Sequence, residues 1–273
     1  MEDLDELVEN FNEILDKCIS ELSFSGFSST SIGFFEDYPE HPKDSVTWWE
    51  TKGANSESGE YQSALKPEFF QLIESLIHII KHKDKGIQNE PKHCICKPNS
   101  QSIHRRYNPY YWGAIHTLKK KRSESNKHVE IQFFINLTKL GMRVGIYVGH
   151  QPGHDNGQWT SHQDRFVERL SSVFEEMNFL KENKGYSFVK TSDQDHATGK
   201  IGRHIEIKNE PDLLKHILEQ KDFTLLKTIS KEKMHSVELV RDIMNIFCET
   251  RKMYELLESR TKLNQRRLRT VKE

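Results

Sequence analysis

The sequence is poor in several features that mark particular classes of protein. Only four of its 273 residues are cysteines, too few and too scattered for a disulfide framework. No apolar run approaches the roughly 20 residues that a membrane-spanning helix needs. The start, MEDLDELVENF, is acidic and amphipathic, unlike a signal peptide. We therefore expect a cytoplasmic protein with reduced thiols and no membrane contact.

Two further absences limit the function. The net charge is only −1, so nucleic-acid binding would need a local basic patch rather than global charge. The chain contains neither the G-x-S-x-G of a nucleophile elbow nor the phosphate-binding G-x-x-x-x-G-K-[ST] loop. His150 and His154 flank a glycine-containing loop, but we expect most of the 14 histidines at the surface. A non-catalytic protein without a cofactor is the favoured interpretation.

The clearest structural pattern covers residues 128–150. Apolar and polar residues alternate from Val129 to Asn136, and alternation resumes from Met142 to Val148 after a short connection containing Gly141. Two alternating runs joined in this way predict an antiparallel β-hairpin with one face buried. Gly145 lies in the second run, where the missing side chain lets another backbone or a ligand come close.

Helical spacing predicts the elements around this hairpin. We expect a helix within residues 1–20, one that opens at Leu65 with Pro67 in its first turn, one over 166–180, one at about 211–220 and a long one from about 234 to 259. Further strands are expected at 110–118, 186–190, 204–208 and 223–227. The fold class is therefore α+β, with a mainly antiparallel sheet around the hairpin. Residues 22–259 would form one domain after the N-terminal helix, and 260–273 a basic tail.

Aromatic and basic residues alternate in two stretches and could form a nucleic-acid surface. Cations neutralise phosphates and exposed rings stack on bases. The alternative is that Trp49 and Trp112 belong to the core and the cations lie on solvated loops. The candidate contact residues are Trp48, Lys52, Arg105, Arg106, Tyr110, Tyr111 and Tyr147.

An enzyme-like pattern gives a second hypothesis. Asp195 precedes Glu206-Ile207-Lys208, as in Mg²⁺-dependent nucleases of the PD-(D/E)xK type, where two carboxylates hold the metal and the lysine orients water. Alternation also explains these residues, because Glu206 and Lys208 would occupy the solvent side of a strand. Magnesium is expected only under this alternative.

A zinc site near residues 93–104 is a weaker possibility. His93, Cys94, Cys96 and His104 offer suitable donors, but structural zinc sites usually separate paired ligands by two to four residues, and only Ile95 separates these cysteines. We therefore expect incidental thiols on a loop and no metal site.

Several motifs occur in an order typical of one family. They are Phe24-Ser25-Gly26-Phe27 with Phe34-Phe35, Trp48-Trp49-Glu50-Thr51-Lys52, Arg105-Arg106 with Pro109-Tyr110, Gly141 to Tyr147, and Leu213 to Leu226. With these motifs the chain resembles the uncharacterised family called domain of unknown function 2461 over most of residues 22–258. Trp49 replaces its usual Phe, and residues 82–104 resemble an insertion.

The resemblance implies an α+β fold but no established activity. More loosely, the plan is similar to an N-terminal reader module of McrB-type restriction systems, an analogy of topology alone. The resulting expectation is a binding module for DNA or RNA in a prokaryotic defence or DNA-modification setting. A protein-interaction subunit that docks through the C-terminal helix and tail is the third hypothesis.

Overall fold

The computed structural model describes residues 4–37, 60–83, 90–96, 100–101, 106–107, 111–115, 131–148, 167–183, 185–190, 204–220 and 223–258. At its centre is an antiparallel sheet in the order β1-β4-β5-β6-β8-β7. Its strands are β1 (Ile95–Cys96), β4 (Tyr111–Ile115), β5 (Ile131–Thr138), β6 (Gly141–Val148), β7 (Tyr186–Val189) and β8 (Phe223–Ile229). Strands β2 (Ser100–Gln101) and β3 (Arg106–Tyr107) form a separate antiparallel pair.

The predicted hairpin is confirmed as β5 and β6. The two strands pair from Ile131 opposite Val148 to Thr138 opposite Gly141, and the Thr138 hydroxyl donates a hydrogen bond to the Gly141 carbonyl oxygen over 2.9 Å. The alternate apolar side chains of both strands enter the main core as predicted. The side chains between them are also buried along most of the hairpin, so the prediction of a single buried face is wrong.

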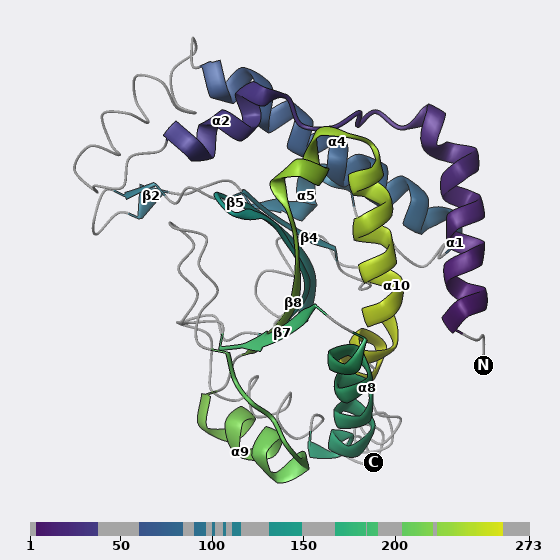
Figure 1. Ribbon diagram of the computed structural model, residues 1–273, viewed down its shortest axis with the longest axis vertical. Helices are drawn as coiled ribbons and strands as arrows, with labels where there is room; N and C mark the ends of the chain where they lie inside the picture. Colours follow the sequence, from purple (N-terminus) through teal and green to yellow (C-terminus); the bar gives the residue numbers. More distant parts are fainter. Residues whose placement is uncertain are drawn as a thin grey trace, which may run out of the picture.

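Helices cover one side of the sheet. Figure 1 shows the sheet as an arc, with α4, α8 and α10 along its convex side and α1 farther out. Phe133 of β5 meets Phe247 of α10 edge to face at 5.0 Å, in the core between sheet and helices. The elements are α1 (Leu4–Cys18), η1 (Ile19–Glu21), α2 (Ser29–Asp37), α4 (Glu60–Lys83), α5 (Pro91–Cys94), α8 (Leu170–Glu182), α9 (Glu210–Gln220), η3 (Lys231–His235) and α10 (Glu238–Glu258).

Amphipathic spacing explains these helices, with one correction. Among the described helices, none has the length and apolar character needed to cross a bilayer. Helix α4 begins at Glu60, so Pro67 lies inside it and not in its first turn as predicted. An interior proline removes one helical hydrogen bond. Leu65, on the N-terminal side of the proline, is fully buried, and this packing supports the helix before Pro67.

The strand predicted at 204–208 is also wrong. Only His204 forms a bridge, to Val189, and the Ile205 amide donates to the Phe188 carbonyl oxygen over 2.9 Å. The following residues prepare the start of α9 instead. Asn209 accepts a hydrogen bond from the Asp212 amide through Oδ1 at 2.9 Å, which is the geometry of a helix N-cap.

Candidate functional site

The sheet face opposite the helices carries an unusual mixture of aromatic and polar residues. Antiparallel register determines its rows, because directly paired residues lie on the same face. One row crosses β4, β5, β6 and β8 as Trp112, Asn136, Arg143 and Thr228, the next as Ala114, Phe134, Gly145 and Leu226, and a third crosses β5, β6, β8 and β7 as Gln132, Tyr147, Thr224 and Val189.

Three rings form a cluster on this face, which we call the aromatic platform: Trp112, Phe134 and Tyr147. Trp112 stacks on Phe134 with centroids 4.8 Å apart and planes 10° apart, while Tyr147 meets Trp112 edge to face at 5.4 Å. The indole Nε1 of Trp112 donates to the side-chain oxygen of Gln132 over 3.2 Å. Phe134 is fully buried, whereas Trp112, Tyr147 and Gln132 are half-buried. The platform therefore offers two partly exposed rings beside an amide.

A buried charge lies beside the platform. Arg143 is only 1% exposed and is paired across the strands with Asn136, which is fully buried. Taking a guanidinium out of water is costly unless it is hydrogen-bonded or paired. Each residue has at least one hydrogen bond, ion pair, ring contact or electrostatic interaction in the structure. The positive charge of Arg143 is thus enclosed next to the rings and is not part of the exposed surface.

Gly145 lets β6 and β8 approach each other beneath the platform. A Cβ at this position would overlap the carbonyl oxygen of Leu225 and lie 2.9 Å from Cα of Leu226. The expectation that this glycine permits a close backbone approach is confirmed, and the approaching backbone is that of β8.

The structure separates the predicted nucleic-acid contacts. Tyr147 lies on the platform. Tyr111, in contrast, is only 4% exposed and packs edge to face against Phe34 and Phe69. The prediction of Tyr111 as a surface contact is therefore wrong. Burial also raises the pKa of Tyr111 to about 12. Neighbouring strand residues face opposite sides, so Trp112 and not Tyr111 reaches the platform.

Of the remaining predicted contacts, only the backbone of Arg106 lies within the described residues. Arg106 opens β3 opposite Gln101. The other predicted contacts, Trp48, Lys52, Arg105 and Tyr110, lie outside the described residues. Alternation within YYWGA places Tyr111 and Trp112 on opposite faces of the strand, but it does not say which face the core covers.

The nuclease residues do not form a described metal site. Glu206 and Lys208 are exposed and lie 3.7 Å apart as an ion pair, while Ile207 between them is buried. This matches the solvent-side alternation, although the segment is not a strand. Burial lowers the pKa of nearby Lys181, and the charge of Glu206 opposes that shift. Asp195 lies outside the described residues.

Metal-binding donors converge elsewhere. Of the residues in the zinc alternative, Cys94 is buried in the main core, whereas the side chains of His93 and Cys96 and the whole of His104 lie outside the described part. Among the described residues, one group of three or more potential ligands lies close together: Cys18, His78 and His82. The sequence carries no signal for this group, because Cys18 is far from the two histidines along the chain.

Comparisons with known proteins add no identification. No family model matches the sequence, and no curated protein matches it. The resemblance to domain of unknown function 2461 therefore stays a prediction.

Proposed function

We propose that the protein is a non-catalytic binding module that contacts nucleic acid through the aromatic platform. The observation that carries this proposal is the pair of half-buried rings, Trp112 and Tyr147, beside the Gln132 amide on one sheet face. Rings on a sheet are suited to stack on unpaired bases, and amides can hydrogen-bond to base edges. Single-stranded DNA or RNA is therefore the favoured ligand, since its bases are accessible.

Electrostatic attraction to phosphates would come from other residues. Arg143 lies on the same sheet face but is enclosed, so it would not bind the phosphate backbone. Lys52, Arg105 and Arg106 remain the predicted phosphate contacts. A setting in prokaryotic defence or DNA modification is the biological context proposed for such a module.

The first test is binding to labelled single- and double-stranded DNA and RNA, by fluorescence anisotropy across a salt series, with Mg²⁺ and with EDTA. We expect affinity for single strands that falls as salt rises, without cleavage. Replacing both Arg105 and Arg106 by alanine should reduce the salt slope by about 1.4 if each contacts one phosphate of a single strand. Affinity unchanged between low and moderate salt would contradict the proposal.

The platform itself is tested by Tyr147→Leu, which keeps an apolar side chain but removes the ring. We expect binding to weaken by about 5- to 150-fold, the usual value of one base–aromatic stack. Phe179→Leu is the matched control, because Phe179 is an exposed ring (41%) on α8. Equal affinities for the two variants would exclude the platform as the contact surface.

Two other outcomes would redirect the assignment. Cleavage that requires Mg²⁺ and is lost in Glu206→Ala would favour the nuclease hypothesis. No interaction at low salt would exclude both nucleic-acid hypotheses and favour a protein partner, through the C-terminal helix and the residues after it. In α10, the apolar face already packs in the core, so such a partner would meet its polar face.

A further inference from the structure

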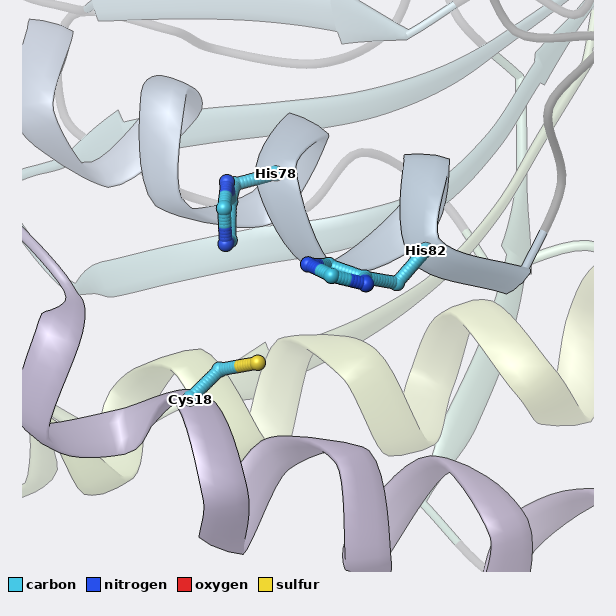
Figure 2. A group of neighbouring side chains, drawn as sticks. All are labelled: Cys18, His78 and His82. Atoms are coloured by element: carbon cyan, nitrogen blue, oxygen red, sulfur yellow. The ribbon is translucent and has the colours of Figure 1, made fainter.

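Two helices bring one thiol and two imidazoles together. Cys18 is the last residue of α1, and His78 and His82 lie one turn apart on α4. Figure 2 shows the Cys18 sulfur pointing toward the two rings, which reach from α4 toward α1. The potential ligand atoms of the three residues lie within 4.8 Å of one another, and the two ring centroids are also 4.8 Å apart.

The fold itself sets this juxtaposition. The chain that leaves α1 runs antiparallel to α4 and contacts it at successive points. The Ser28 amide donates to Oε2 of Glu68 over 3.0 Å, and the Ser23 hydroxyl donates to Oε2 of Glu74 over 2.9 Å. Nearer the N-terminus of this segment and nearer the C-terminus of α4, Cys18 lies beside His78 and His82. Leu15, one turn before Cys18, is 1% exposed in the core. The end of α1 is therefore anchored by core packing before Cys18 and by the contacts with α4 after it.

We propose that Cys18, His78 and His82 form a zinc site. Zinc binds cysteine sulfur at about 2.3 Å and histidine nitrogen at about 2.0–2.1 Å, usually with tetrahedral geometry. Those bond lengths place neighbouring ligand atoms about 3.3–3.6 Å apart. The donors therefore need to close by little more than about 1 Å, which rotation of the exposed imidazoles can supply.

The donor set selects the class of metal. Thiolate and imidazole suit zinc and related transition metals, whereas Mg²⁺ and Ca²⁺ prefer oxygen ligands. Three protein ligands leave the fourth tetrahedral position for water or for a donor from another molecule. Cys18 is 8% exposed and both histidines are exposed, so the site lies at the edge of the α1–α4 contact with access from solvent.

Bound zinc would join α1 to α4. Because the ligands come from two helices, the metal would stabilise their contact, and binding would release the thiol proton of Cys18. The site is separate from the aromatic platform and does not depend on the proposed function. Zinc should therefore raise the melting temperature of the full chain without requiring nucleic acid.

The test uses the full chain, treated with EDTA and then titrated with Zn²⁺ or with Co²⁺ as a spectroscopic substitute. We expect one equivalent to bind, with a thiolate-to-cobalt absorption band and the visible bands of tetrahedral cobalt. His82→Ala should weaken binding by at least about 10-fold, because removing a ligand costs no less than removing a residue that orients one. His82 is exposed, so its replacement leaves the core intact.

Matched variants make the result decisive. Cys18→Ala should abolish the thiolate band, while Cys248→Ala, which removes another buried free thiol, should preserve it. His204→Ala, at an exposed histidine outside the group, should bind like the unmodified chain. Cobalt spectra without a thiolate band, or equal affinity in His82→Ala and His204→Ala, would show adventitious binding by surface histidines and overturn the proposal.

Discussion

Replacing Gly145 by alanine is expected to destabilise the protein, because β6 and β8 approach each other closely at this residue. In Gly145→Ala the new methyl would overlap the Leu225 carbonyl oxygen and lie 2.9 Å from Cα of Leu226, against 3.4 Å or more for an ordinary contact. The obstructing atoms are backbone, so no side-chain rotation relieves the overlap, and the two strands must separate. Overpacking costs about 1–3 kcal/mol, and loss of the two nearest ladder hydrogen bonds adds about 1–3 kcal/mol. We expect a loss of about 2–6 kcal/mol, a large part of the stability of a typical domain.

The measurement is equilibrium urea unfolding followed by tryptophan fluorescence and circular dichroism. Gly185→Ala is the control, because Gly185 also has a positive φ, 86°, but a Cβ there would meet only the flexible side chain of Lys227, at 3.4 Å. Backbone strain alone should cost the control about 1–2 kcal/mol. If Gly145→Ala unfolds at the same urea concentration as Gly185→Ala, the close approach of β6 and β8 at this residue is refuted.

Two further predictions concern stability. Burial raises the pKa of Tyr111 from 10.0 to about 12, so above pH 10 the folded state keeps a proton that the unfolded state loses, and the free energy of unfolding falls. At pH 11 the free energy of unfolding is lower by about 1.4 kcal/mol for this reason. Tyr111→Phe should therefore reduce the fall in denaturation midpoint between pH 9 and 11. An unchanged pH profile would show that Tyr111 ionises normally. Asn209→Ala removes the cap of α9 and should cost about 1 kcal/mol, seen as faster amide exchange in the first turn of that helix, whereas Asn209→Asp, which can still cap, should retain protection.

The sequence predicted the regular elements well wherever burial follows a simple period. The hairpin follows from alternation over residues 129–148, and the main helices follow from apolar residues three and four apart. The errors occurred where local signals compete. Pro67 was expected near a helix start, but packing of Leu65 extends α4 before it. Residues 205–208 alternate like a strand, but they directly precede the N-cap at Asn209, where α9 begins.

The site was less predictable than the fold. Tyr111 and Trp112 are adjacent and both aromatic, and only the position of the core decides that Tyr111 is enclosed while Trp112 faces the platform. Arg143 occupies a position that alternation assigns to the solvent side, and its side chain is charged, yet it is almost completely buried. Local sequence carries no signal for such burial, because it depends on which segments cover that face.

The sequence by itself determined the α+β class, the central hairpin and the spacing of its helices, because these depend on neighbours a few residues apart. The tertiary structure alone decided which side chains meet. His78 and His82 share a helix face by spacing, but Cys18 joins them only because the chain after α1 folds back along α4. Likewise, Tyr147 reaches Trp112 only through the registers of β4, β5 and β6. Local periodicity specifies elements, whereas contacts between distant residues depend on how those elements pack.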